Sequence, residues 1–128
     1  MNKFSVSLVS CGEKQLPGEH PAKELYLSND FQRLKKRFEE HGIIWYILST
    51  EHGLVHPEKI LRKYDKPLSL MTEDDIHGWV ENVFNAICLL SVQEVAIHDT
   101  KGFRAKLSDL LARRLQEKGI RVKFSWTL

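Results

Sequence analysis

Apolar and polar residues alternate along the chain in a pattern that predicts strands and helices in turn. Residues 4–9 are strand-like, and residues 43–49 are apolar on both faces, as in a central strand of a parallel sheet. Between them, a helix is predicted to begin at Asn29 as its N-cap, with Gln32 at the capping-box position and Gly42 as its terminator. This part of the chain therefore predicts a β-α-β unit.

The second half of the chain repeats this alternation. Thr72 is predicted to open a helix, because acidic residues fill the first turn and apolar residues then fall on one stripe. Strands are predicted at 93–98 and 120–126, with a helix over 103–119 between them. The last strand alternates apolar and basic residues, which indicates a solvated face. We therefore expect a single Rossmann-like α/β domain of three layers, with a mainly parallel sheet of about four strands.

Composition adds limits to this picture. A chain of 128 residues, 42% of them hydrophobic, is long enough for one domain with its own core. The first residues fit neither a signal peptide nor a membrane span, so we expect a cytoplasmic protein with no membrane partner. The two cysteines, Cys11 and Cys88, are too few for a disulfide framework, and we expect both to be reduced thiols.

The net charge of +2 excludes little, but its distribution is uneven. Residues 101–128 carry eight basic residues against two acidic ones, and we call this segment the basic C-terminal arm. Such a bias is typical of a solvated helix face, and it also fits a surface that contacts phosphates. The arm residues that could contact phosphates include Arg113, Arg114, Lys118, Arg121 and Lys123.

Two long irregular segments, 11–28 and 50–71, follow predicted strands, and so does the short turn 99–102. Structureless connections of this length are uncommon in a compact domain unless they have a function. In open α/β sheets, ligands bind beyond the carboxyl ends of the strands. The sequence therefore predicts a site where these three segments meet.

In the first segment, Cys11 and Gly12 follow the strand and Lys14 lies close behind. Gly12 allows a tight turn, and Lys14 together with the helix start near Asn29 favours an anion. The spacing matches neither a P-loop nor a dinucleotide fingerprint. Lys14 could equally be a surface lysine, and Cys11 is either a nucleophile or a buried structural cysteine.

In the second segment, Ser49, His52 and Gly53 directly follow the central strand. A histidine there could act as a general acid or base near pH 7, or it could only bond the loop backbone. His52 and His56 have the spacing of a zinc pair, but Gly53 and Pro57 oppose a continuous helix, so we expect no metal. Pro57 is instead predicted to start a short helix, PEKILRKY.

Further candidates lie at the ends of these segments. Tyr64 and Asp65 could fold back over the pocket, with Asp65 as a hydroxyl acceptor or base, or as a simple turn residue. Asp99 closes the third predicted strand, and Lys101 and Arg104 lie beside the start of the next helix. These two basic residues either hold a phosphate or are solvated.

Several pieces of the chain resemble a known group of proteins. The segments LVSCGEKQL, AKELYLSNDFQ and WYILSTEHGLVHPEKILRKYDKPL, with the charged helix after the third strand, are similar to small YaaA-related domains of unknown function. The peroxide-stress YaaA proteins share a related core, although this chain is shorter and lacks their helical additions. Departures are Glu13, Gln15 and Lys63, where lysines and a proline are common. The resemblance implies a Rossmann-like core and a site drawn from Cys11, Gly12, Lys14, Tyr26, Ser28, Ser49, His52, Gly53, Tyr64 and Asp65.

Two functions stay open. The first is an enzyme on a nucleotide, nucleoside or modified nucleobase, without a cofactor, in which Lys14, Ser28 and the helix start hold phosphate or ribose. His52 would be the acid or base, Asp65 would orient a hydroxyl or water, and Ser49 would also be catalytic. The second is a nucleic-acid-binding module that uses the basic C-terminal arm. We favour the enzyme, because polar residues clustered at strand ends make a poor nonspecific phosphate surface.

Overall fold

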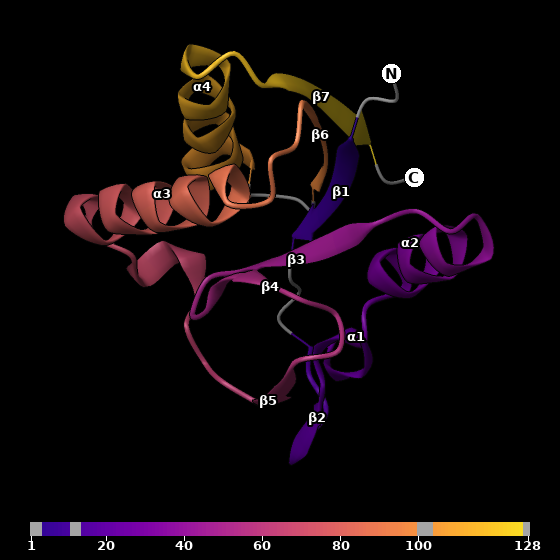
Figure 1. Ribbon diagram of the computed structural model, residues 1–128. Helices are drawn as coiled ribbons and strands as arrows, with labels where there is room; N and C mark the ends of the chain where they lie inside the picture. The colour runs from indigo at the N-terminus through magenta and orange to yellow at the C-terminus, as the bar shows by residue number, and fades with distance from the viewer. Residues whose placement is uncertain (1–3, 11–13, 100–103, 127–128) are drawn as a thin grey trace.

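The computed structural model describes residues 4–10, 14–99 and 104–126 (Figure 1). Within these residues the chain forms a mixed α/β fold with a five-stranded main sheet and a two-stranded small sheet. The main sheet contains β1 (Ser5–Ser10), β3 (Trp45–Ser49), β4 (Gly53–Val55), β6 (Glu94–Asp99) and β7 (Arg121–Trp126), and the small sheet pairs β2 (Glu19–Pro21) with β5 (Ile60–Arg62). The α-helices are α1 (Ala22–Leu25), α2 (Asn29–Glu40), α3 (Glu73–Cys88) and α4 (Asp109–Glu117), with a 3₁₀ turn at Leu68–Leu70 and a π-helical turn at Arg104–Ser108.

The main sheet has the strand order β4-β3-β1-β6-β7. Strand β1 pairs in parallel with β3 and β6, so that Val9 lies opposite Ile47 and His98. Strands β6 and β7 are also parallel. Ser49 and Asp99, the last residues of β3 and β6, therefore lie at the same edge of the sheet, as the sequence predicts. Cys11, which was expected at this edge too, lies outside the described residues.

The sequence predicted the four parallel strands correctly, and two features differ from it. Strand β4 turns back from β3 and pairs with it antiparallel, with Ser49 opposite Gly53. The segment PEKILRKY was predicted to be a short helix, and this is wrong, because it contains β5. Burial alternates along this strand, with only Leu61 buried, and Leu61 lies opposite His20 of β2. The small sheet and α1 lie beyond the ends of β1 and β3 (Figure 1).

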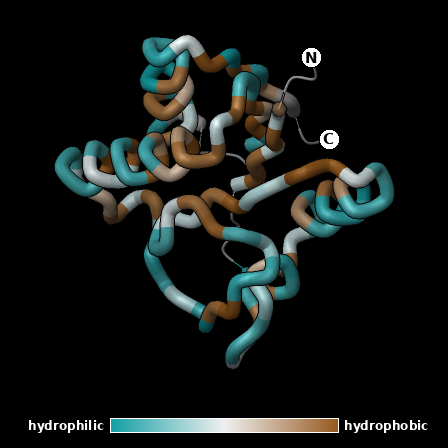
Figure 2. Tube along the Cα trace, viewed as in Figure 1, coloured by the Kyte–Doolittle hydropathy of each residue, from teal (hydrophilic) through white to brown (hydrophobic). Residues whose placement is uncertain are grey.

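The core is divided between two hydrophobic clusters, because successive side chains of a strand point to opposite faces. Val6 and Leu8 of β1 belong to a cluster with the buried residues of α3 and α4. Val9 belongs to the other cluster, with Phe31 and Phe38 of α2. Figure 2 shows hydrophobic and hydrophilic residues alternating around α3, as expected for a helix with one buried side.

The start of α2 differs from the prediction in its cap. Ser28, not Asn29, is the N-cap residue, and its hydroxyl accepts a hydrogen bond of 3.2 Å from the backbone N–H of Phe31. Gln32 does not form a capping box, because its side chain donates to the carbonyl of Tyr26 at 2.6 Å. Gly42 has a φ of +63°, the left-handed conformation that ends many helices, as predicted.

The start of α3 and the face of β7 agree with the sequence. The Thr72 hydroxyl accepts from the Asp75 N–H at 3.1 Å, and the Asp75 carboxylate accepts from the Thr72 N–H at 3.0 Å, which completes a capping box. On β7, Arg121 and Lys123 are exposed, whereas Phe124 packs against the core. In the part of the chain that the structure describes, no helix is long and apolar enough to cross a membrane.

Candidate functional site

Three hydroxyl groups form a hydrogen-bonded chain at the carboxyl end of β3, and we call it the hydroxyl chain. The Ser49 hydroxyl donates to the Tyr64 hydroxyl at 2.8 Å, and the hydroxyls of Tyr64 and Tyr26 are 2.6 Å apart. Ser49 and Tyr26 are fully buried, and Tyr64 is half-buried. The hydroxyl chain therefore connects β3 with the segments 14–27 and 56–65, which are far apart in the sequence.

His52 lies at the outer side of the hydroxyl chain. Its backbone N–H donates to the Ser49 hydroxyl at 3.0 Å, and its ring meets the Tyr64 ring edge-on, with centroids 5.2 Å apart. The side chain is exposed to solvent, but partial burial lowers the pKa of the imidazole below its usual value; Glu51 opposes this shift and Lys59 adds to it. At pH 7 the imidazole is therefore mainly neutral and can accept a proton.

Gln15 joins the two loops, although the sequence did not single it out as a site residue. Its side-chain oxygen accepts a hydrogen bond of 2.9 Å from the backbone N–H of Tyr64, and its backbone forms a β-bridge with Tyr26. The carbonyl of the neighbouring Lys14 accepts from the N–H of Leu27 at 2.9 Å. The bond from Tyr64 to Gln15 spans 49 residues, so no local pattern could have predicted it.

The remaining candidates have different environments. The Lys14 and Asp65 side chains are exposed, and Asp65 directly follows the half-buried Tyr64. Ser28 acts as the cap of α2, and Gly53 opens β4 with a φ of +73°. Cys11 and Gly12 lie outside the described residues.

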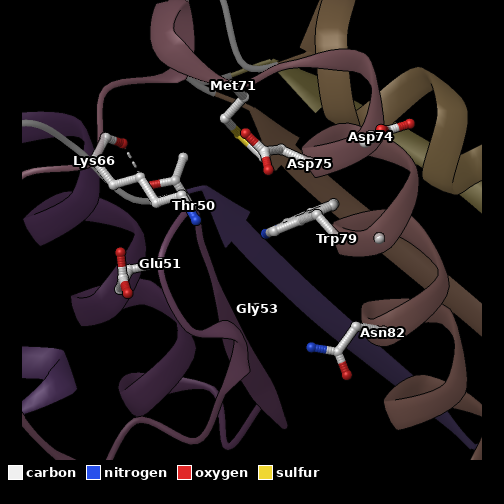
Figure 3. Close-up of a pocket in the computed structure, with 10 residues that line it drawn as sticks. Thr50, Glu51, Gly53, Lys66, Met71, Asp74, Asp75, Trp79 and Asn82 are labelled. Carbon is white, nitrogen blue, oxygen red and sulfur yellow. Dashed lines mark hydrogen bonds between the residues drawn. The ribbon is translucent and has the colours of Figure 1, made fainter.

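A groove of about 290 Å³ lies on the α3 side of the end of β3 (Figure 3). We call it the acidic groove. Of the residues that the sequence proposed for the site, Gly53 is the one that lines it. The lining residues are Thr50, Glu51, Gly53, Lys66, Met71, Asp74, Asp75, Gly78, Trp79 and Asn82.

The acidic groove and the hydroxyl chain both lie at the end of β3. The Trp79 indole N–H donates to the Ser49 carbonyl at 2.8 Å, and the Thr50 hydroxyl donates to the Lys66 carbonyl at 2.8 Å. The backbone of Ser49 is thus held from α3, while its side chain belongs to the hydroxyl chain on the other face. The sequence did not mark Trp79 or Thr50 as site residues. Trp79 belongs to the apolar stripe of the predicted helix, and Thr50 lies in a loop.

Comparison with known families gives one match. A family model described as a family of unknown function (DUF6884) matches residues 6–124. The chain belongs to the DUF6884 family. The matched region includes the hydroxyl chain and the acidic groove. No curated protein and no solved structure was found to match. The DUF6884 match does not name the YaaA-related domains, so that relationship stays a prediction.

The basic C-terminal arm of this DUF6884 member carries several internal ion pairs. Arg114 bonds Glu81 at 2.7 Å, and its guanidinium lies 3.9 Å above the centre of the Phe84 ring. Arg121 and Lys123 both pair with Glu94, at 3.3 and 3.2 Å. Arg113 and Lys118 are exposed.

Other polar groups near the strand ends are bonded to each other. The Ser108 hydroxyl donates to the Asp99 carboxylate at 3.0 Å, and both residues are buried. The His56 ring accepts from the Glu58 N–H at 3.1 Å and packs against Tyr46. Within residues 4–10, 14–99 and 104–126, no group of three or more His, Cys, Asp or Glu side chains is placed to hold a metal ion.

Proposed function

We propose that the protein is an enzyme that acts on a nucleotide, a nucleoside or a modified nucleobase at the carboxyl edge of the main sheet. The observation that carries this proposal is the hydroxyl chain with His52 at its outer side. Buried hydroxyls are costly unless they are hydrogen-bonded, and apolar side chains would fill the same space at no such cost. A connected polar network beside an exposed histidine is therefore better explained by catalysis than by packing.

His52 takes the role of general acid or base. Its neutral imidazole accepts a proton from a substrate hydroxyl or amino group and returns it later in the reaction. Ser49 is a positioning residue, because its hydroxyl already accepts from the His52 N–H and donates to Tyr64. Asp65, exposed beside Tyr64, orients a substrate hydroxyl or a water molecule.

The phosphate or ribose end of the substrate binds at the first loop. Lys14 is exposed, and its carbonyl is bonded to Leu27, just before the start of α2. A helix N-terminus and a nearby ammonium group both favour an anion. Ser28 supports this end indirectly, since its hydroxyl caps the helix. Some of the YaaA-related domains that the chain resembles are found with genes for modified nucleobases, and this supports a nucleobase as the other end of the substrate.

The same resemblance supports a finer description of the fold. We propose one Rossmann-like domain of three layers, in which α2 covers one face of the sheet and α3 with α4 covers the other. The support is the division of the core, because neighbouring residues of β1 belong to different clusters. We also propose that the chain is a distant relative of the YaaA proteins and works in the cytoplasm.

The test is a turnover screen with nucleotides, nucleosides and modified nucleobases, read by mass spectrometry. His52→Ala is expected to reduce turnover by about 10²- to 10⁴-fold, with little change in melting temperature. His41→Ala is the matched control, because His41 is an exposed histidine at the C-cap of α2. Equal turnover by the His52→Ala and His41→Ala variants would overturn the assignment of His52.

The nucleic-acid-binding alternative is tested in the same experiment with the double variant Arg113→Glu and Lys118→Glu. These side chains are exposed, whereas Arg114 is tied to Glu81 and Phe84, and its loss would disturb packing. We expect this double variant to keep turnover. If it loses function together with salt-dependent nucleic-acid binding, while His52→Ala keeps both, the protein is a binding module instead.

A further inference from the structure

Gln15 is held by both loops that contribute tyrosines to the hydroxyl chain. Its backbone forms a β-bridge with Tyr26, and its side-chain oxygen accepts a hydrogen bond of 2.9 Å from the backbone N–H of Tyr64. The residue is buried, with 8% of its surface exposed. A side chain that is already fixed loses little freedom when it binds a ligand, so its remaining polar group is preorganised.

The bond to Tyr64 uses only one half of the Gln15 amide. A backbone N–H can be met only by the amide oxygen, so the orientation of the amide is fixed and its NH₂ group keeps two donors. Within the part of the chain that the structure describes, no hydrogen bond from this NH₂ group is seen. An unbonded donor on a buried residue is costly, and it indicates a bound water molecule or a ligand.

The side chains of Lys14 and Gln15 leave the chain in opposite directions, because the backbone is extended at the β-bridge. Lys14 is exposed, whereas Gln15 reaches Tyr64, whose ring contacts the His52 ring. The proposed function assigns the phosphate or ribose to Lys14 and proton transfer to His52. The Gln15 amide therefore belongs to the side of the loop where the nucleobase would meet His52.

We propose that the Gln15 NH₂ group donates to a carbonyl oxygen of the nucleobase, and so selects oxo bases such as hypoxanthine over amino bases such as adenine. This inference rests on the proposed function and names the substrate class of that site. A neutral amide suits a neutral carbonyl, whereas charged ammonium and guanidinium groups suit phosphates. An amino group at the same place would set donor against donor and leave both unpaired, which is how polar sites reject close analogues.

The experiment is a titration of ¹⁵N-labelled protein with inosine and with adenosine, followed by NMR. Inosine carries a carbonyl where adenosine carries an amino group. The side-chain NH₂ signals of Gln15 report on the proposed contact, and the backbone amides of His52 and Tyr64 report on binding at the site. We expect inosine to shift all of these signals saturably, with a Kd on the order of 1 mM, and adenosine to bind about tenfold more weakly.

The variant Gln15→Glu separates the donor role from a structural one. A carboxylate still accepts from the Tyr64 N–H, but its second oxygen is an acceptor where the NH₂ group was. We expect inosine binding to weaken about tenfold and adenosine to become the preferred ligand. Gln116→Glu makes the same change at an exposed position on α4 and should leave the preference for inosine unchanged. A thermal melt checks that each variant is folded, and the wild-type comparison of the two nucleosides decides the matter if Gln15→Glu is not.

The outcomes separate this inference from the function on which it rests. If both nucleosides shift the His52 and Tyr64 amides equally while the Gln15 NH₂ signals stay in place, the site binds nucleosides without Gln15, and only the inference is wrong. If the folded Gln15→Glu variant keeps the preference for inosine, the NH₂ group binds water only, and the inference is again wrong. If neither nucleoside shifts any of these signals, the proposed substrate class and the inference are both wrong.

Discussion

Replacing Tyr64 by phenylalanine tests whether the hydroxyl chain is a real structural unit. The substitution removes one oxygen atom and keeps the ring that packs against His52. That oxygen accepts from Ser49 at 2.8 Å and is bonded to Tyr26 at 2.6 Å. Both partners are fully buried, so water cannot easily replace the lost bonds.

The expected cost follows from the partner left behind. In the variant, the Ser49 hydroxyl still accepts from the His52 N–H, but it loses the acceptor for its own proton. Leaving a buried donor unsatisfied costs about 1–3 kcal/mol, more than the net gain from an ordinary hydrogen bond. We therefore expect Tyr64→Phe to lower the free energy of unfolding by about 2 kcal/mol. The melting temperature should fall by about 3–5 °C for each kcal/mol lost.

The assay is urea denaturation of both the variant and a matched control, Tyr46→Phe. Tyr46 is half-buried, and its ring packs against His56, but no hydrogen bond of its hydroxyl is seen among the described residues. The control is expected to change stability by less than about 0.5 kcal/mol. If the two variants have the same stability, the hydroxyl chain contributes nothing to the fold and the reasoning is wrong.

Three further predictions concern the elements around the site. Gly78→Ala should stabilise the protein by about 0.5–1 kcal/mol. Gly53→Ala should destabilise it by about 1–2 kcal/mol, because Gly53 has a φ of +73°. The denaturation midpoints of the two variants would show these opposite changes. Thr72→Ala should cost about 1 kcal/mol, since it removes the capping box of α3, and thermal melts would measure this. Stability should fall as the pH drops below about 6.5. Burial, aided by Arg37, lowers the pKa of His98 in the folded state, so the unfolded chain binds a proton first as the pH falls. His98→Leu should therefore reduce the dependence of the melting temperature on pH, measured across about pH 5–7.

Strands that carry a complete burial pattern could be predicted from the sequence. The run IIWYILS is apolar on both faces, and Ile47 and Leu48 of β3 are indeed fully buried. Strand β4 was not predicted, because it has three residues in a segment rich in polar residues. Its extended conformation depends on pairing with β3. The helix predicted at Pro57 failed for a similar reason, since pairing with β2 overrides the local preference of PEKILRKY.

The proximity of candidate site residues could be predicted where polar residues directly follow a strand, and less well elsewhere. Ser49 and His52 stand at the end of the central strand, so their proximity follows from chain order alone. Tyr64 was proposed to fold back over the pocket, but its hydrogen bond with Tyr26 could be seen only in the folded chain. Gln15 was noted as a departure from the YaaA-related pattern, which commonly has a lysine at this position. Its side-chain amide oxygen accepts a hydrogen bond from the Tyr64 N–H. A lysine has no acceptor to offer there, so the departure has a structural reason.

The end of β3 is held from both faces of the sheet. Successive residues point to opposite faces, so the Ser49 side chain enters the hydroxyl chain while Thr50 lines the acidic groove. The Ser49 carbonyl is also bonded to Trp79, which fixes the strand end against α3. That bond uses the backbone of Ser49, whereas the hydroxyl chain uses its side chain, so Ser49 is held on each face by a different chemical group. A shift of Trp79 would therefore move Ser49 and, with it, the hydroxyl that accepts from the His52 N–H.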